Sequence, residues 1–153
     1  MSKCYIRQAN IEDYNSVEMI MRQVQKMHVE WRPDLYKIGE VVLPYEMYSD
    51  LINNENAIVA ERNGNVVGFL FYEKRYIENC NQVTRNVIFV DSMGVEEVCR
   101  SQGIGRAMFD YIVEMKKKFG YDKIELLVNS NNLRAKEMYE KYGFKEKSVI
   151  MEM

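Results

Sequence analysis

Cysteine, proline and long apolar runs are all scarce in this sequence of 153 residues. Its three cysteines, Cys4, Cys80 and Cys99, are odd in number and widely separated, so neither a disulfide framework nor a CxxC metal or redox motif is available. No apolar run is long enough to span a bilayer, and the start of the chain lacks the basic and apolar segments of a secretory signal. We therefore expect free thiols, no metal centre, no membrane partner and a cytoplasmic location.

An excess of charge of one sign is also lacking. Lysine and arginine number 21 against 23 aspartates and glutamates, which gives a formal net charge of -2. The basic run Lys116–Lys118 falls at the end of an expected helix, where positive charge complements the helix dipole. Nucleic-acid binding requires a concentrated basic surface. The sequence therefore predicts no nucleic-acid partner.

What the chain does have is the composition of one globular domain. Hydrophobic residues make up 47% and charged residues 29%, close to the average for soluble proteins. The only two prolines are Pro33 and Pro44, and no repeat, low-complexity tract or linker divides the chain. Its length is also near the commonest domain size. We therefore expect residues 1–153 to form a single domain.

Capping and turn residues divide the first half of the sequence into short elements. Asn10, with Asp13 three residues later, matches the start of a helix whose apolar positions continue to Val24. Asn63-Gly64 is typical of a tight hairpin, because both residues adopt positive φ angles readily. The expected elements are a strand at 5–8, a helix at 10–24, an irregular segment at 27–43, a helix at 44–54, and strands at 57–61 and 66–76.

The second half alternates strands and helices. Gly94 interrupts a strand rich in β-branched residues, and Gly120 and Gly143 follow two amphipathic patterns, where glycine commonly ends a helix. The expected elements are a strand at 84–95, a glycine loop at 100–106, a helix at 104–119, a strand at 123–128, a helix at 132–142 and a strand at 144–153. This order predicts an α/β fold in which helices cover both faces of a mixed sheet.

The glycine loop is a candidate phosphate-binding site. Without Cβ atoms at Gly103 and Gly105, the backbone can curl its N–H groups around an anion at the start of a helix. Glycines also open many helices that bind nothing, so the loop alone leaves both interpretations standing. A dinucleotide fingerprint is excluded because Met108 stands where a small residue is needed, and a P-loop is excluded because Gly-Lys-Ser/Thr is absent.

A second motif follows this loop at a fixed distance. Asn132, Ala135, Tyr139 and Gly143-Phe144 form the pattern N-x-x-A-x-x-x-Y-x-x-x-G-F, after the R-x-x-G-x-G of the loop. Together the two motifs resemble the acetyl-CoA-binding motifs of the GNAT superfamily of N-acetyltransferases, and the order of elements agrees along nearly the whole chain. The resemblance implies a twisted mixed sheet whose central strand pair is splayed by a bulge, for which Gly94 is the candidate.

The resemblance also implies which residues bind acetyl-CoA. The loop N–H groups are expected to hold the CoA pyrophosphate, and the backbone of the splayed strand is expected to contact the acetyl carbonyl and the pantetheine arm. Asn132 serves equally well as a plain helix N-cap. The implied acetyl-CoA-binding residues are Met93, Val95, Arg100, Gln102, Gly103, Ile104, Gly105, Arg106, Asn132, Ala135 and Tyr139.

Two catalytic residues follow from the same resemblance. Tyr139 is at the position of the general acid that protonates the leaving thiolate, although it also belongs to the apolar stripe of its helix. Asp91 is at an acidic position that some members use as the base for the amine. Glu96 and Glu97 are more typical of solvated charges, and His28 has no sequence partner that marks it as a base or ligand.

The implied reaction is transfer of an acetyl group from acetyl-CoA to a primary amine by direct attack in a ternary complex. The alternatives are an acetyl-CoA-binding regulatory or sensor module with little turnover, and a protein N-terminal or lysine acetyltransferase. Five acidic residues in the segment 28–50 suggest an acceptor that is a small cation, unless they only solvate a loop: Glu30, Asp34, Glu40, Glu46 and Asp50. The apolar segment 148–153 suggests a homodimer.

Overall fold

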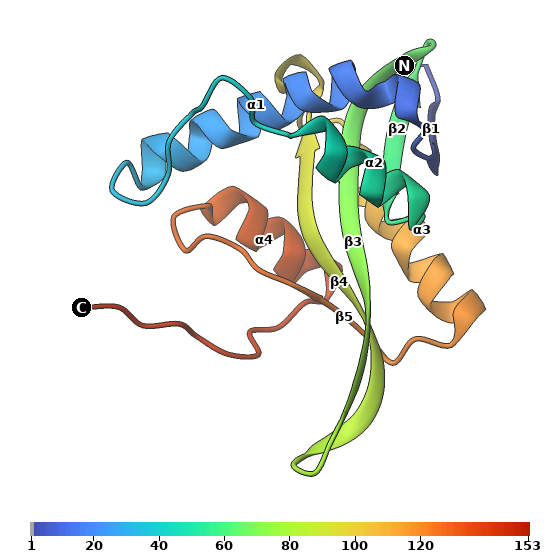
Figure 1. The fold of residues 1–153 in the computed structure, drawn as a ribbon, viewed down its shortest axis with the longest axis vertical. Helices are drawn as coiled ribbons and strands as arrows, with labels where there is room; N and C mark the ends of the chain where they lie inside the picture. The colour runs from blue at the N-terminus through green and yellow to red at the C-terminus, as the bar shows by residue number, and fades with distance from the viewer. Residues whose placement is uncertain (1) are drawn as a thin grey trace.

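The computed structural model describes residues 2–153 as one twisted five-stranded sheet flanked by helices (Figure 1). The strand order is β1-β2-β3-β4-β5, and every pairing is antiparallel except the parallel pairing of β4 with β5. The elements are β1 (Cys4–Gln8), a 3-10 turn (Ile11–Asp13), α1 (Tyr14–Trp31), α2 (Tyr45–Asn53), β2 (Ala57–Arg62), β3 (Asn65–Asn79), β4 (Gln82–Val95), a 3-10 turn (Glu97–Cys99), α3 (Ile104–Phe119), β5 (Lys123–Leu126) and α4 (Leu133–Tyr142). The predicted mixed α/β fold is confirmed.

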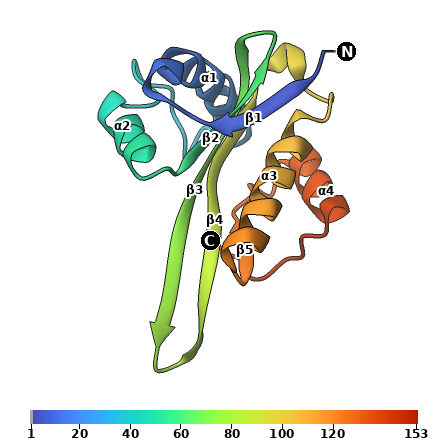
Figure 2. The same cartoon turned by 90° about the vertical axis from the view of Figure 1, so that its right-hand side faces the viewer.

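The helices form two layers, with α1 and α2 on one face of the sheet and α3 and α4 on the other (Figure 2). Strand β3 contributes apolar side chains to the cores on both faces of the sheet, because successive side chains of a strand point to opposite faces. Phe69 and Phe71 are buried in the core beneath α1 and α2, while Leu70 and Tyr72 are buried in the core beneath α3 and α4. A sheet with both faces covered in this way holds its central strands rigidly.

Local capping and turn signals in the first half of the chain are confirmed. The Asn10 side chain accepts a hydrogen bond from the Glu12 N–H, and the Asp13 carboxylate accepts one from the Asn10 N–H. The hairpin between β2 and β3 turns at Asn63 and Gly64, with φ angles of 52° and 77°. Both signals depend on residues close in sequence, so tertiary packing did not override them.

The irregular segment expected from residue 27 begins later in the structure. Helix α1 continues through His28 and ends at Trp31, so the expected helix end near Val24 was wrong. Pro33 accounts for the actual end, because the residue before a proline is biased away from helical backbone angles and Arg32 has φ -141° and ψ 73°. The last turns of α1 lack a core-type apolar stripe because they face a cavity rather than the sheet.

The bulge expected at Gly94 lies at Asp91 instead. The pairing of β3 with β4 shifts between Phe71 opposite Ser92 and Tyr72 opposite Val90, which leaves Asp91 as the extra residue. Gly94 serves the other purpose expected of it, a close approach. A Cβ atom there would lie 2.7 Å from Val24 Cγ2 and 2.8 Å from Phe69 Cε1. Helix α1 therefore packs directly on the backbone of β4.

Strand β4 separates from β5 just after Val90. The two strands pair only from Val87 with Lys123 to Val90 with Leu126, so β5 is two residues shorter than the expected 123–128. From 92 to 95 strand β4 remains paired with β3 alone. The expected splayed strand pair is therefore present, and it leaves one edge of β4 without a neighbouring strand.

The strand expected at 144–153 does not form. These residues have no regular secondary structure, and the segment runs outward below α4 (Figure 1). Val149, Ile150 and Met151 are exposed and pair with no strand among residues 2–153. Ion pairs of Lys147 with Glu125 and of Lys136 with Glu146 tether its start. Apolar composition alone therefore did not create a strand, although the outer edge of β5 has no strand partner among residues 2–153.

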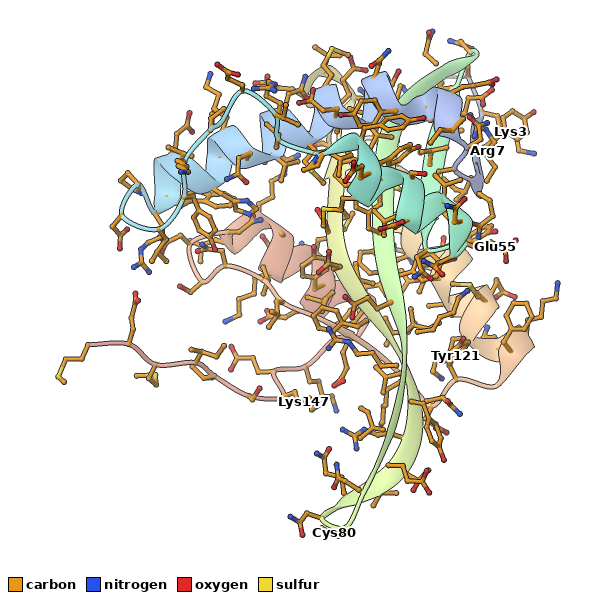
Figure 3. All side chains as sticks on the ribbon, viewed as in Figure 1. Lys3, Arg7, Glu55, Cys80, Tyr121 and Lys147 are labelled. Carbon is orange, nitrogen blue, oxygen red and sulfur yellow. The ribbon has the colours of Figure 1, made fainter. Side chains whose placement is uncertain are left out.

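The outer part of β3 and β4 extends from the body as a two-stranded ribbon. Cys80 lies at its tip, as Figure 3 shows, and Tyr76 and Val83 are exposed on it. The expected loop between these strands is confirmed. Within residues 2–153, no helix combines the length and the apolarity needed to cross a bilayer.

Candidate active site

A cleft of about 520 Å³ opens where β4 and β5 separate. Its walls come from β4 between Val90 and Val95, the segment 126–129 after β5, the loop that opens α3, one face of α4 and the end of α1. These predicted site residues line it: Asp91, Met93, Val95, Arg100, Gly103, Ile104, Gly105, Arg106, Asn132, Ala135 and Tyr139. The fold therefore brings together two motifs that the sequence separates by a helix and a strand.

The loop before α3 has the geometry of an anion site. Ser101 and Gly103 have φ angles of 62° and 81°, so the backbone curls in the left-handed region. The first bond into the helix runs from the Ala107 N–H to the Gly103 carbonyl, at 3.0 Å. The six preceding N–H groups, of residues 101–106, have no hydrogen-bond acceptor among residues 2–153. Successive free N–H groups at a helix N-terminus attract phosphate.

Gln102 is the one predicted site residue that does not line the cleft. Its side-chain oxygen accepts a hydrogen bond from Arg62 Nη1 at 2.6 Å, and its side-chain nitrogen donates to the Val98 carbonyl at 3.3 Å. The side chain therefore fixes the loop against the end of β2. Only its backbone N–H remains available to the anion site.

Three arginines line the cleft, two of them in or beside this loop. Arg100 Nε donates to the Val95 carbonyl at 3.0 Å, and the Arg106 guanidinium lies 5.7 Å from the centre of the Tyr142 ring. Arg134 also lines the cleft and was not predicted from the sequence. Arg134 could have been identified from the sequence, because a positive charge in the first turn of a helix is unfavourable with the helix dipole and indicates some other role. The combined positive charge suits a pyrophosphate.

Tyr139 combines packing with access to the cleft. Its ring lies 5.5 Å from that of Phe109 and 5.9 Å from that of Phe144, and the residue is buried. The hydroxyl donates to Met93 Sδ at 3.4 Å, which directs it toward β4. Burial raises the pKa of Tyr139 to about 12, so the phenol keeps its proton at neutral pH. Both interpretations of this residue, packing and proton donation, are compatible with its position.

Asn132 both caps α4 and lines the cleft. Its side-chain oxygen accepts a hydrogen bond from the Ala135 N–H at 3.2 Å, so it is the N-cap of α4. Asn132 and Ala135 also line the cleft. The capping role leaves its amide group free to donate, and a helix N-terminus again faces the cleft.

Asp91 projects from the bulge of β4 into the same cleft. Asp91 is exposed as a whole residue, but partial desolvation in the cleft raises the pKa of its carboxyl, nearby Glu73 raises it further, and Arg75 partly opposes the shift. Glu96 and Glu97 do not line the cleft. Glu96 accepts a weak hydrogen bond from Cys99 Sγ at 3.6 Å, and Glu97 is exposed.

A second cavity of about 300 Å³ lies between α1 and the segment 37–42. Val24, His28 and Ser92 line both this cavity and the cleft, so the two spaces meet at these residues. The His28 ring lies 5.5 Å from that of Trp31 and 5.2 Å from that of Tyr36. Burial lowers the pKa of His28, which favours the neutral imidazole.

His28 was undervalued at the level of sequence because its helix was expected to end too early. Of the two alternatives for the acidic segment 28–50, a solvated loop agrees better with the structure than a wall of an acceptor site. None of Glu30, Asp34, Glu40, Glu46 and Asp50 lines the cleft or the second cavity. Asp34 is instead paired with Arg32 at 2.6 Å, on the outside of the molecule.

A splayed strand pair, a phosphate-type loop at a helix N-terminus and a buried phenol define the acyl-CoA-binding class of acetyltransferase folds. Comparison of the sequence with known families agrees with this geometry. Residues 21–144 match the acetyltransferase (GNAT) family, and the chain belongs to that family.

Individual relatives cover the chain to different extents. The N-acetyltransferase MJ1207 of Methanocaldococcus jannaschii is 34% identical over 98 residues, and the match spans 64% of this chain but only 42% of that protein. The L-amino acid N-acetyltransferase AaaT of Escherichia coli is 28% identical over 94% of this chain and 84% of its own. The crystal structure of a mutant BH1408 protein from Bacillus halodurans superposes with a TM-score of 0.92 at 26% identity, covering 97% of this chain and 98% of that one.

Proposed function

We propose that this protein transfers an acetyl group from acetyl-CoA to a primary amine by direct attack within a ternary complex. The observation that carries the proposal is the meeting of two cavities at Val24, His28 and Ser92. The cleft is large enough for the reactive arm of acetyl-CoA, and the smaller cavity shares three lining residues with it on the side of α1. Two reactants held there would be close without a covalent enzyme intermediate.

The cofactor side of this complex is provided largely by backbone. The free N–H groups of residues 101–106 would hold the pyrophosphate, with Arg100 and Arg106 beside them. Backbone groups of Met93 and Val95, on the strand edge left without a neighbour, would contact the acetyl carbonyl and the pantetheine arm. A backbone N–H aimed at the oxyanion is worth about 3 kcal/mol in other acyl-transfer enzymes.

Tyr139 is the proposed general acid. The amine first forms the N–C bond and gives a tetrahedral oxyanion, the C–S bond then breaks as the carbonyl re-forms, and the departing sulfur needs a proton. A phenol with a pKa of about 12 remains protonated at neutral pH, whereas a thiol has a reference pKa of about 8.5. The thiolate is thus a weaker base than the phenolate of Tyr139 and would not take its proton completely. Tyr139 therefore acts chiefly through a hydrogen bond that strengthens as charge develops on sulfur.

The acceptor ammonium, with a reference pKa of about 10.4, must lose a proton before it attacks. His28 is the first candidate to accept it, because it lines both cavities and its lowered pKa keeps the imidazole neutral. Asp91, the candidate from the sequence, is the second. Asp91 lines the cleft but not the second cavity, which we assign to the acceptor and call the acceptor cavity. It would therefore act through an intervening water.

An acetyl-CoA sensor with little turnover is the competing function. A sensor has no use for a second cavity that shares residues with the cleft, or for a phenol in the cleft, so these features favour the enzyme. The name of the E. coli relative, an L-amino acid N-acetyltransferase, supports a small primary amine as acceptor. Acetylation of protein N-termini or lysines remains a competing acceptor class.

Two further proposals concern the protein as a whole. We place it in the cytoplasm, in keeping with its free cysteines and with a CoA-dependent reaction. We also propose a homodimer in which a second copy covers the exposed apolar side chains of residues 149–151. Light scattering at micromolar concentration tests the dimer, and a monomer alone would refute it.

The test of the proposed activity combines binding with turnover. Isothermal titration calorimetry with acetyl-CoA and with CoA should show binding of both. Thiol release with a panel of primary amines should exceed the rate without amine, and mass spectrometry should find one acetyl group on the amine. Binding without acetylation of any amine would favour the sensor, and no binding would remove both functions.

A further inference from the structure

The cavity between α1 and the segment 37–42 has a distinctive chemical lining. Met21, Val24, Val41 and Val42 provide apolar surface. Gln25, His28, Lys37 and Ser92 provide polar groups. Lys37 is the only permanently charged residue of the lining, and no carboxylate belongs to it. A cavity of this composition would attract an anion and an apolar group and would repel an additional cation.

The outer wall of this cavity is fixed to α1 by hydrogen bonds. Arg22 donates to the carbonyls of Gly39 and Glu40 at 3.2 and 2.8 Å, and Gln25 donates to the Lys37 carbonyl at 3.0 Å. Glu18 accepts from the Val42 N–H at 3.3 Å and also pairs with Arg22 at 2.6 Å. The segment is therefore held in place although it has no regular secondary structure.

Several polar groups of the lining are left over from this network. Lys37 forms no ion pair among residues 2–153. The His28 ring and the Ser92 hydroxyl make no hydrogen bond within the same residues, and the Gln25 amide oxygen accepts none. Free donors and acceptors around an apolar pocket are the usual means of orienting a small ligand.

From this arrangement we infer that the acceptor is a small amino-acid-like amine, with an apolar body and an anionic group that Lys37 recognises. The inference rests on the proposed function and specifies its acceptor. The amine must reach the place where the two cavities meet, beside His28 and Ser92. Its apolar body then lies along Met21 and Val41, and its carboxylate faces Lys37. A polyamine or an aminoglycoside would instead bring extra positive charge to Lys37.

The test compares acceptors that differ in one group. Thiol release is measured with L-leucine, L-leucinamide, spermidine and a Leu-Gly-Gly tripeptide at one pH. We expect kcat/KM for leucine to exceed that for each of the others by about tenfold or more. Leucinamide is the strict comparison, because it keeps the body and the amine of leucine and lacks only the carboxylate. Its amine is the less basic of the two, so easier deprotonation cannot produce a preference for leucine.

Substitutions at Lys37 test the recognition itself. Lys37→Met should raise the KM for leucine about tenfold and leave that for leucinamide within about twofold, while Lys37→Arg should keep the preference. Lys26→Met is the matched control, since Lys26 is exposed on α1 and lines neither cavity. Lys37 is exposed as well, so its replacement should not impair folding.

The outcomes separate this inference from the proposed function. Equal or better use of leucinamide, spermidine or the tripeptide would overturn the inference, as would a Lys37→Met effect that is the same for leucine and leucinamide. Acetyl-CoA binding is measured on every variant by calorimetry. If acetyl-CoA binds and no acceptor is acetylated, titration of leucine into the CoA complex decides, and no binding of leucine overturns the inference. No binding of acetyl-CoA would refute the proposed function itself.

Discussion

The cleft and the acceptor cavity meet at three residues but are built from different materials. The cleft combines side chains with backbone that has no hydrogen-bond partner within residues 2–153: the N–H groups of residues 101–106, the unpaired edge of β4 and the first turn of α4. The acceptor cavity is formed by side chains, from α1 on one side and from the irregular segment 37–42 on the other. Side-chain hydrogen bonds from Arg22 and Gln25 keep this second wall in place.

This difference has a consequence for specificity. A backbone site depends on φ angles and on strand geometry, so it tolerates most changes of side chain and binds one constant cofactor. A side-chain site changes its ligand when one residue changes. The cofactor half should therefore respond sharply only at a few positions, whereas each lining residue of the acceptor half should alter selectivity. The following substitutions test this division.

The largest effect is expected from removal of the Tyr139 hydroxyl. Tyr139→Phe keeps the contacts of the ring with Phe109 and Phe144, so acetyl-CoA affinity and melting temperature should change little. We expect kcat to fall by about a hundredfold or more, the usual contribution of a general acid. Tyr142→Phe is the control, because its hydroxyl bonds to Asp110 outside the cleft. A kcat within about twofold of the wild type would show that the phenol only packs.

Gly103→Val should weaken acetyl-CoA binding at least about tenfold, or 1.4 kcal/mol, as measured by calorimetry. The φ angle of +81° excludes a β-branched residue without distortion of the loop, although a Cβ atom at this position would meet nothing within 4 Å. Gly120→Val is a close control, since Gly120 has φ +72°, equally open surroundings and a position outside the cleft. Both variants should lose similar stability. Unchanged affinity in folded Gly103→Val would refute the loop assignment.

His28→Gln and Asp91→Asn compare the two proposed proton acceptors. A base acts when deprotonated, so kcat/KM should fall as the pH drops through its pKa. For His28 that pKa lies below the ordinary 6.5, so wild-type activity should persist to below about pH 6.5. We expect His28→Gln to lower kcat/KM about tenfold and to remove the decrease of kcat/KM at low pH. Asp91→Asn should retain that decrease. The opposite pattern would transfer the role to Asp91, whose raised pKa would place a limb above its ordinary 3.8.

The smallest effect is expected at Gln102, although it belongs to the glycine loop. Its side chain points to Arg62 and Val98, so Gln102→Ala should change acetyl-CoA affinity by less than about twofold. Calorimetry on the folded variant measures this. A tenfold loss would mean that the side chain reaches the cofactor after all, and the contrast between backbone and side-chain sites would weaken accordingly.

The cofactor half could be predicted from sequence because its signals are local. Gly103, Asn132 and Tyr139 stand at fixed spacing along the chain and all line the cleft, and a glycine with positive φ or an N-cap requires only its neighbours. The acceptor half could not be predicted in this way. Lys37 and Ser92 lie in an irregular segment and in a strand far away in sequence, and only tertiary packing brings them together.

The errors in the fold have the same origin. The bulge lies at Asp91 rather than at the glycine because pairing with β3 determines the register. Residues 148–153 have the composition of a strand but pair with no strand among residues 2–153, although the outer edge of β5 is also unpaired there. The end of α1 was predicted too early because the residues after Val24 line a cavity instead of the core, so the helical spacing of apolar residues does not continue there.

Because Gly94 has no side chain, α1 lies close to β4, and this affects the cavity one helical turn away. With only a hydrogen at that position, Val24 and Ile20 of α1 rest on the backbone of β4. One turn further along α1, His28 thereby comes to line the same space as Ser92 of β4. A methyl group at 94 would act as a spacer between helix and strand and would move the acceptor away from the thioester. Since a displacement of about 1 Å can cost a hundredfold in rate, the proposed reaction should be sensitive to any side chain introduced at Gly94.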